Sequence, residues 1–289
     1  MKHDRVIALG FFDGVHLGHA ALLRLTRRRA DELGIPAAVL TFDTHPDTLV
    51  YHQPVPLINT LEDRKYLMEE KFSMDEVILA HFDRAMMEMP WEAFVEDYLL
   101  GELGAKHVVC GHDFSFGYRG QGTPDKLRRL CAQRGVGVNV VDKVSLGGIT
   151  VSSTHIRQLI RQGDMEAAAQ MLGHRHFLSG EVLHGKELGR RLGFPTANLA
   201  LPEGLIAPAY GVYATLVTLP DGSAHPAVTN VGVRPTVHDQ LGRLVEAWIL
   251  DCTAELYGEK IRVEFFTRLR GEKKFDSLEA LREEVLRNA

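Results

Sequence analysis

The stretch RVIALGFFDGVHLGH, residues 5–19, determines how the first half of the chain folds. Its first residues, Arg5-Leu9, form a short apolar run that is typical of a buried strand. Gly10 ends that run, and Gly14 follows four residues later. The residues Leu17-Leu33 then repeat apolar side chains at helical spacing until Gly34, a residue type that commonly ends helices. The stretch therefore predicts a strand, a tight turn and a helix, in that order.

The same alternation of strand and helix continues through about the first 170 residues. Further strands are predicted at Ala37-Phe42, Glu76-Phe82, Lys106-Gly111 and Val136-Val144, and helices at Leu61-Lys71 and Trp91-Leu103. Strands that alternate with helices favour a parallel sheet covered on both faces. We therefore predict an α/β, doubly wound nucleotide-binding domain over residues 1–174.

From about His174 the pattern changes, because predicted strands now follow one another with turns between them. These strands are Phe177-Leu183, Gly211-Leu219, Ala227-Val231, Leu244-Leu250 and Ile261-Arg268, with a turn at Pro220-Asp221-Gly222 and a closing helix at Ser277-Arg287. Short consecutive strands indicate a small antiparallel barrel or sandwich. We predict that residues 175–289 form this second domain, after a helical segment at Asp164-Gly173.

Composition narrows the class of protein. The formal net charge is −5, which gives no support for nucleic acid or an acidic membrane as a partner. Cys110, Cys131 and Cys252 are odd in number and not in CxxC spacing, which argues against a disulfide framework and for a reducing compartment. The first residues contain no apolar run of the length of a signal peptide or membrane span. We expect a cytoplasmic protein that is a monomer or a weak homo-oligomer.

Two histidines follow the first predicted strand, three residues apart. His16 and His19 share one side of a helix's first turn, where unpaired N–H groups and the helix dipole favour an anion. Glycines let a phosphate approach the backbone there, and imidazole donors can stabilise developing phosphate charge. Two surface histidines or a zinc site are alternatives, but no HExxH pattern supports zinc. The candidate phosphate-binding residues around the pair are Gly10, Phe12, Asp13, Gly14 and Gly18.

A second polar segment precedes a predicted helix at Ile156-Arg161. Ser152, Ser153 and Thr154 can hold phosphate with their hydroxyl groups, and Arg157 lies one turn further on, where a guanidinium can grip phosphate oxygens. Simple helix capping is the alternative explanation for one of the hydroxyls. Together, the two segments resemble the HxGH nucleotidyltransferase superfamily, in which they flank the triphosphate of ATP. A class I aminoacyl-tRNA synthetase is disfavoured, since the chain is short and lacks a KMSKS-like loop.

Further motifs make the resemblance more specific. The segments Thr41-Phe42-Asp43, His45-Pro46 and Gly111-Gly117 (GHDFSFG) stand in the order seen in the prokaryotic bifunctional riboflavin kinase/FMN adenylyltransferase family. By this resemblance Asp113 contacts nucleotide, although a packed aromatic turn also explains Phe114 and Phe116. The string GRRLGFPTAN, residues 189–198, and NVGVRPT, residues 230–236, resemble the flavokinase signature, and no Walker A loop is present.

The resemblance implies roles for residues of the second domain. Thr196 and Asn198 supply neutral oxygens for Mg²⁺, and Glu246 is the general base for the ribityl hydroxyl of riboflavin. From its periodicity alone, Glu246 is an outward-facing strand glutamate. The implied ATP- and flavin-binding residues are Gly180, Gly185, Gly189, Arg190, Gly193, Pro195, Asn230 and Arg234.

The implied function is two ATP-dependent reactions with small-molecule substrates: phosphorylation of riboflavin to FMN, and adenylylation of FMN to FAD. Two positions depart from the family pattern, Thr44 in place of proline and His155 in place of arginine. A neutral histidine attracts phosphate less than a guanidinium does. A kinase that has lost adenylylation therefore remains an alternative. Others are a non-catalytic flavin sensor and a different adenylyltransferase, for pantetheine phosphate or a nicotinate nucleotide.

Overall fold

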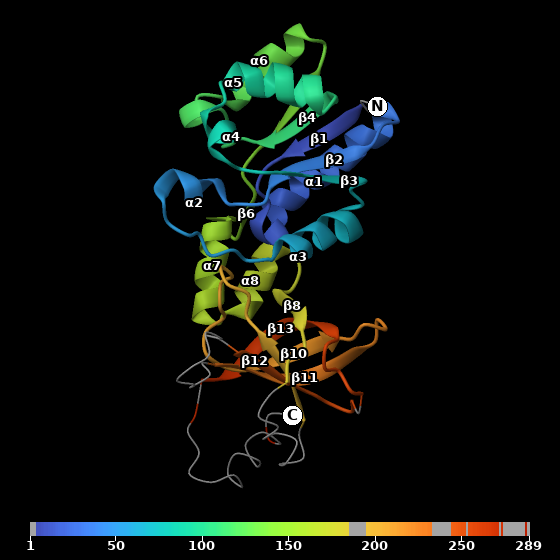
Figure 1. Ribbon diagram of the computed structural model, residues 1–289, viewed down its shortest axis with the longest axis vertical. Coiled ribbons are helices and arrows are strands. Elements are labelled where there is room, and N and C mark those ends of the chain that lie inside the picture. Colours follow the sequence, from blue (N-terminus) through green and yellow to red (C-terminus); the bar gives the residue numbers. More distant parts are fainter. Residues whose placement is uncertain are drawn as a thin grey trace. The chain divides into compact units, whose positions relative to one another are not determined.

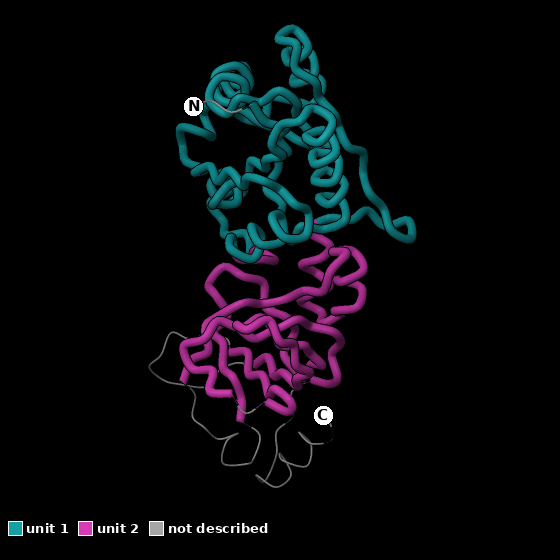
Figure 2. Tube along the Cα trace, turned by 90° about the vertical axis from the view of Figure 1, so that its right-hand side faces the viewer, with its two compact units in different colours: residues 1–56, 61–152 teal, residues 57–60, 153–289 magenta. Residues whose placement is uncertain are grey.

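The computed structural model describes residues 4–184, 195–232, 244–252, 254–271, 273 and 287. The chain divides into two compact units (Figure 2). Unit 1 contains residues 1–56 and 61–152, and unit 2 contains residues 57–60 and 153–289.

Unit 1 is built on a sheet of five parallel strands in the order β3-β2-β1-β4-β5. The strands are β1 (Arg5–Leu9), β2 (Ala37–Phe42), β3 (Glu76–Ala80), β4 (Ala105–Gly111) and β5 (Gly137–Val141). The strand order reverses between β1 and β4, which pair directly although two other strands separate them along the chain. Ligands of open α/β sheets bind beyond the carboxyl ends of the strands at such a reversal.

Helices cover both faces of this sheet, with α1 and α3 on one face and α5 and α6 on the other (Figure 1). The larger helices are α1 (Leu17–Leu33), α3 (Leu61–Tyr66) with its π-type continuation η2 (Leu67–Lys71), α5 (Trp91–Ala93) with its π-type continuation η3 (Phe94–Glu102), and α6 (Pro124–Gln133). Shorter elements are η1 (Asp13–Val15), α2 (Pro46–Tyr51), α4 (Arg84–Glu88), η4 (Tyr118–Gly120), and the hairpin strands β6 (Ser145–Leu146) and β7 (Ile149–Thr150). The predicted doubly wound domain is confirmed.

Alternating side chains of the central strands explain why both faces are covered. On one face, Ile7 and Leu9 of β1 belong to a buried cluster with Phe94 and Leu99 of η3 and Leu127 of α6. The intervening residues Val6 and Ala8 are also completely buried, and helix α1 contacts β1, β2 and β4. Burial on both faces accounts for the continuous apolar run in β1, because a parallel sheet leaves neither face to water.

Unit 2 is a nearly closed barrel of six antiparallel strands in the order β8-β13-β10-β11-β12-β9. The strands are β8 (Phe177–Glu181), β9 (Thr196–Ala200), β10 (Gly211–Thr218), β11 (Ala224–Gly232), β12 (Leu244–Ile249) and β13 (Lys260–Arg270), preceded by helices α7 (Ser153–Gln162) and α8 (Met165–Leu172). The first and last strands of this order are bridged just beyond β8, where the Leu183 N–H donates to the Asn198 carbonyl at 2.8 Å. The predicted small antiparallel barrel is confirmed.

The main difference from the sequence prediction in unit 2 is strand β9. The sequence pattern predicts no strand between Phe177-Leu183 and Gly211-Leu219, but Thr196 and Asn198 lie on β9, which pairs with β12. A strand of five residues next to several glycines gives too short a pattern to be recognised. In unit 1, helix α6 was also missed, although the Thr123 hydroxyl caps it by accepting the Lys126 N–H at 3.3 Å. The predicted helix Ser277-Arg287 lies, apart from its last residue, outside the described residues.

A buried histidine makes the barrel's stability depend on pH. His176 is completely buried beside Phe265, neither ring nitrogen has a hydrogen-bond partner among the described residues, and burial lowers its pKa to about 3. As the pH falls below about 6.5, the His176 ring of the unfolded chain is protonated before that of the folded chain, which favours unfolding. We expect unfolding free energy to fall by about 1.4 kcal/mol per pH unit below that point. Urea unfolding followed between pH 7 and 4 measures this slope. A His176→Leu variant should reduce it, whereas a change at exposed His184 should not.

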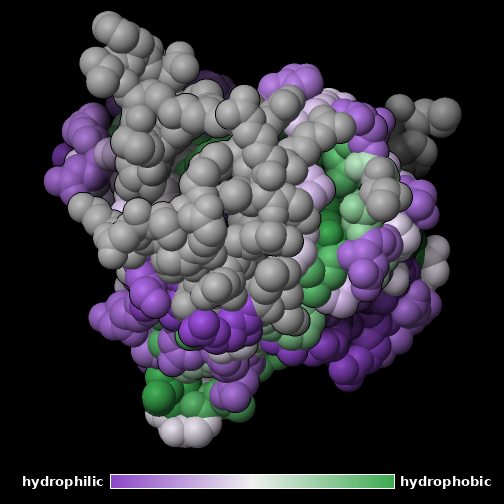
Figure 3. All heavy atoms as spheres, turned by 90° about the horizontal axis from the view of Figure 1, so that it is seen from below, coloured by the Kyte–Doolittle hydropathy of each residue, from purple (hydrophilic) through white to green (hydrophobic). Residues whose placement is uncertain are grey.

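The described surface is mixed in polarity. Seen from below, apolar side chains form strips bordered by hydrophilic ones (Figure 3). No helix among the described residues is long and apolar enough to cross a membrane. Cys110 and Cys131 are buried free thiols, and burial raises their pKa values to about 12 and about 11, so both are poor nucleophiles.

Candidate active sites

The first candidate site follows strand β1 at the reversal of strand order in unit 1. Leu9 pairs with Cys110, so Gly10 and Gly111 leave the two central strands at the same level of the sheet. The segment from Gly10 to His19 and the segment from Gly111 to Gly117 therefore begin side by side at the carboxyl edge. Ligands of open α/β sheets bind beyond this edge.

The turn between β1 and α1 adopts an unusual backbone conformation. Gly14 has φ 78°, which glycine adopts easily. Phe12 has φ 60° and Val15 has φ 41°, values that residues with a side chain rarely adopt. A side chain on Gly10 would lie 3.1 Å from the ring of Phe12, which is completely buried. Strain of this kind is retained where the surrounding structure holds it, and it commonly marks functional sites. Asp13 is buried in the same turn.

His16 and His19 lie together as the spacing predicted. Their rings stack with centroids 3.6 Å apart and an interplanar angle of 11°. His16 caps helix α1, because its Nδ1 accepts the His19 backbone N–H at 3.3 Å. In the neutral ring this leaves the proton on Nε2, which can donate to a ligand. Gly18 makes room for the pair, since a Cβ there would lie 3.0 Å from the His16 ring.

His19 is held in its neutral form. Burial, the neighbouring His16 and the Arg64 cation, in that order, keep the pKa of His19 well below its ordinary value. Its Nδ1 is buried with no hydrogen-bond partner among the described residues. A neutral imidazole can donate one N–H to an incoming phosphate without adding a second full charge beside Arg64.

The remaining residues predicted for this site are divided between the units. Ser152 ends unit 1, whereas Ser153, Thr154 and Arg157 belong to α7 in unit 2. Arg157 is buried, while Thr154 is exposed. Their grouping with His16 and His19 around one triphosphate stays a prediction.

The segment after β4 combines a packed half and an open half. Phe116 is buried against Phe94 with ring centroids 5.1 Å apart, so the packing explanation holds for this aromatic residue. The Asp113 side chain is 82% exposed at the carboxyl edge of the sheet. It is therefore accessible to a ligand, and its contact with nucleotide remains a prediction.

The second candidate site is a polar row across three neighbouring strands of unit 2. Glu246 on β12 lies directly opposite Asn198 on β9 and Asn230 on β11. Residues directly opposite one another project from the same face of a sheet. Val245, Ala247 and Ile249 are buried, so Glu246 projects from the other face, as periodicity predicted. That face, however, places two side-chain amides beside the carboxylate.

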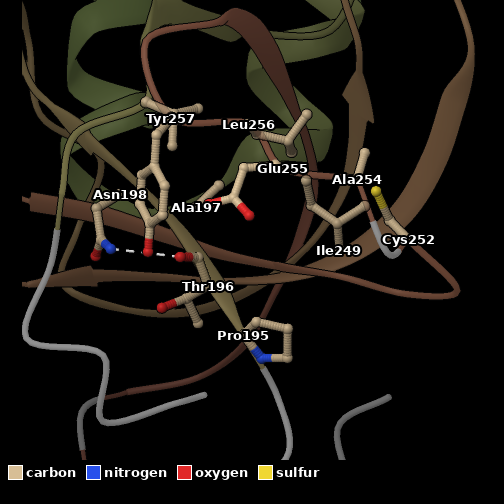
Figure 4. Close-up of a pocket in the computed structure, with 11 residues that line it drawn as sticks. Pro195, Thr196, Ala197, Asn198, Ile249, Cys252, Ala254, Glu255, Leu256 and Tyr257 are labelled. Carbon is tan, nitrogen blue, oxygen red and sulfur yellow. Dashed lines mark hydrogen bonds between the residues drawn. The ribbon is translucent and has the colours of Figure 1, made fainter.

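A cavity of about 150 Å³ opens next to this row (Figure 4). Pro195, Thr196 and Asn198 form part of its wall, and Asn198 is only 6% exposed. The Asn198 side-chain amide donates to the backbone carbonyl of Thr196 at 3.4 Å, which leaves its oxygen as an acceptor. Ligand pockets ordinarily enclose roughly 300–1,000 Å³, so the cavity can enclose only part of a nucleotide or flavin.

Sequence reasoning missed several residues of this wall. Tyr257 lines the cavity, and its ring stacks on His184 with centroids 4.0 Å apart. Cys252 and Leu256 also line it. None of the three was among the predicted site residues, because only the folded barrel brings the segment before β13 to the cavity that β9 also lines. In unit 1, Arg64 was missed for the same reason.

The other residues predicted for the second domain are only partly described. Gly180 lies on β8, where a Cβ would approach Leu199 to 3.2 Å, so its role in packing is evident. Gly185, Gly189, Arg190, Gly193 and Arg234 lie outside the described residues.

Two family models match the chain in the same order as the two units. The model described as FAD synthetase matches residues 1–155, and the model described as riboflavin kinase matches residues 172–289. A solved structure described as a macrolide-efflux protein from Streptococcus pneumoniae is similar over 100% of this chain and 95% of its own, with a TM-score of 0.85 and 30% identity.

Curated relatives carry both activities in their names. The bifunctional riboflavin kinase/FMN adenylyltransferase of Listeria monocytogenes is 37% identical over 280 residues, which cover 96% of this chain and 88% of the relative. The enzyme of the same name from Bacillus subtilis is 34% identical over 288 residues, which cover 97% and 89%. With both domain models matched and relatives aligned along nearly their whole length, the chain belongs to the bifunctional riboflavin kinase/FMN adenylyltransferase family.

Proposed function

We propose that unit 1 adenylylates FMN with the histidine pair His16 and His19, and that unit 2 phosphorylates riboflavin with Glu246 as general base. The overall function is two-step synthesis of flavin nucleotides, riboflavin to FMN and FMN to FAD, with ATP used in each step. The observation that supports the residue assignment is that each unit carries its own polar cluster in the segment its family model covers. We place the boundary between the catalytic domains after residue 174.

In the adenylylation step, an oxygen of the FMN phosphate attacks the α-phosphorus of ATP. A new P–O bond forms, the bond between the α-phosphorus and the bridging oxygen breaks, and pyrophosphate leaves. His16 and His19 donate hydrogen bonds to phosphate oxygens as charge develops on them. The helix dipole at the start of α1 adds to this stabilisation. The hydroxyls of Ser152, Ser153 and Thr154 and the guanidinium of Arg157 hold the triphosphate.

In the kinase step, the Glu246 carboxylate accepts the proton of the ribityl 5′-hydroxyl. The hydroxyl oxygen attacks the γ-phosphorus of ATP, the bond to the bridging oxygen breaks, and ADP leaves. Asn198 and Asn230 flank the carboxylate in the sheet register and can fix its orientation through their amide groups. The strand scaffold holds these three side chains, which favours catalysis by positioning.

The residues of unit 2 fit a magnesium ion that is shared with ATP. Mg²⁺ prefers oxygen ligands, keeps several waters and binds through phosphate oxygens, so it needs few protein ligands. Thr196 offers a hydroxyl and Asn198 an amide oxygen at the cavity wall. Among the described residues, no group of three or more His, Cys, Asp and Glu could hold a metal ion. The bound ion would neutralise phosphate charge during phosphoryl transfer.

The substitution Asn198→Ala tests this assignment. We expect riboflavin phosphorylation to weaken in a way that added Mg²⁺ partly restores, with an apparent Mg²⁺ affinity lowered roughly 10- to 100-fold. Chromatography of products from riboflavin, ATP and Mg²⁺ over time measures FMN and FAD together. Adenylylation of supplied FMN by the same protein is the internal control. An unchanged Mg²⁺ dependence in folded Asn198→Ala protein would remove this residue from the metal site.

The proposed partners are small molecules only. The net charge of −5 gives no basis for nucleic-acid binding, and we propose a cytoplasmic monomer or weak homo-oligomer. Sedimentation of the purified protein at several concentrations tests the oligomeric state, and a tight dimer or larger species would contradict it.

A further inference from the structure

A buried cation, Arg64, lies close enough to the histidine pair of unit 1 to act on His19 electrostatically. Arg64, on α3, is only 1% exposed and is among the largest fully buried side chains of the described residues. Burying a charge is costly unless the charge is paired or used. Burial lowers the Arg64 pKa to about 10, while Asp13 and Asp43 oppose this change, so the guanidinium stays charged at neutral pH.

The contacts of Arg64 hold the turn that precedes the histidines. Its Nη1 donates to the Phe11 carbonyl at 2.6 Å, and its Nη2 donates to the Phe42 carbonyl at 2.9 Å. The Thr41 hydroxyl donates to the same Phe11 carbonyl at 2.9 Å. The Arg64 Cζ lies over the Phe11 ring, 4.2 Å from the ring centroid. Two donors thus fix the peptide that enters the left-handed conformation at Phe12.

The guanidinium also acts on the histidine pair electrostatically. Its Nε has no hydrogen-bond partner among the described residues. The charged and titratable groups that act on His19 are His16, stacked on it, and Arg64, and the carboxylates of Asp13 and Asp43 act in turn on Arg64. The Phe12 ring covers a further side of His19, with centroids 5.1 Å apart. A fixed positive charge here disfavours a second positive charge on His19.

We propose that Arg64 is a positioning residue for FMN adenylylation: its planar fork, which donates to the Phe11 and Phe42 carbonyls, fixes the Phe11–Phe12 turn that leads to His16 and His19. The inference rests on the proposed role of His16 and His19. An arginine that only filled the core would be replaceable by an apolar side chain of similar length. A positioning arginine would not be, because the turn depends on its two donors, and its charge adds to the effects of burial and His16 that lower the pKa of His19.

The test compares Arg64→Met and Arg64→Lys with the unchanged protein. For Arg64→Met we expect FAD formation from FMN to fall roughly 100-fold, the loss typical of a misplaced catalytic group, with riboflavin phosphorylation unchanged. The acid limb of the adenylylation pH profile should move to higher pH, because His19 then takes up a proton more readily. Arg64→Lys keeps the charge and loses the fork, so its kcat should fall while its pH profile stays.

Controls separate the possible outcomes. Arg24→Met removes another guanidinium that lies over a phenylalanine, Phe72, and should leave adenylylation intact. Wild-type kcat and pH profile in folded Arg64→Met would overturn the inference. If Arg64→Met does not fold, a wild-type kcat in Arg64→Lys overturns it instead. If His19→Ala also keeps full adenylylation, the proposed function of the histidine pair fails as well. If the Arg64 variants keep full adenylylation but His19→Ala loses it, the role of Arg64 fails and the proposed function of the histidine pair stands.

Discussion

Replacing His19 by alanine is expected to abolish FAD formation while riboflavin phosphorylation continues. The variant removes a half-buried imidazole whose ring stacks on that of His16 with centroids 3.6 Å apart, so the phosphate loses one donor and the remaining ring loses its support. Loss of one such donor costs roughly 10²–10³ in kcat. Incubation with FMN, ATP and Mg²⁺ followed by chromatography of FAD measures the effect.

Two controls show whether the loss of FAD formation is specific to His19. His52→Asn changes an exposed histidine of the same unit and should leave FAD formation unchanged. FMN formation from riboflavin by the His19→Ala protein reports that the second unit is intact. Loss of both activities in a folded variant would contradict independent sites, and full FAD formation would remove His19 from the catalytic step.

Glu246→Gln should have the opposite effect: FMN formation is lost, and FAD formation from supplied FMN is retained. The amide occupies the place of the carboxylate between Asn198 and Asn230 but cannot accept the hydroxyl proton. Loss of a positioned general base typically lowers the rate about 10²–10⁴-fold. Single-turnover phosphorylation of riboflavin with labelled ATP measures the chemical step directly.

Glu264→Gln is the matched control, because Glu264 is a partly buried glutamate on β13 of the same barrel, away from the polar row. It should phosphorylate riboflavin at the normal rate. If Glu246→Gln kept that rate, Glu246 would be the outward-facing strand glutamate that periodicity alone suggests. A mixture of the His19→Ala and Glu246→Gln proteins should again convert riboflavin to FAD if FMN leaves one site and binds the other.

Local sequence was sufficient for most elements and for the histidine pair. The run Arg5-Leu9 predicted a buried strand, and Gly34, at φ 65°, ends α1 where glycine is most favourable. His16 and His19 are three residues apart on one helix start, so their proximity follows from helical geometry alone. The order of strands and helices likewise predicted a doubly wound domain followed by a barrel.

Tertiary structure decided what lies beside these elements. The neighbours of Glu246 come from two other strands, and only the register of β9, β12 and β11 brings Asn198 and Asn230 next to it. Arg64 reads as an ordinary charged residue of a surface helix, and it becomes a buried cation only because α3 packs against the turn at Phe11. Local patterns reflect interactions over a few residues, whereas strand register and helix packing depend on contacts between segments far apart in sequence.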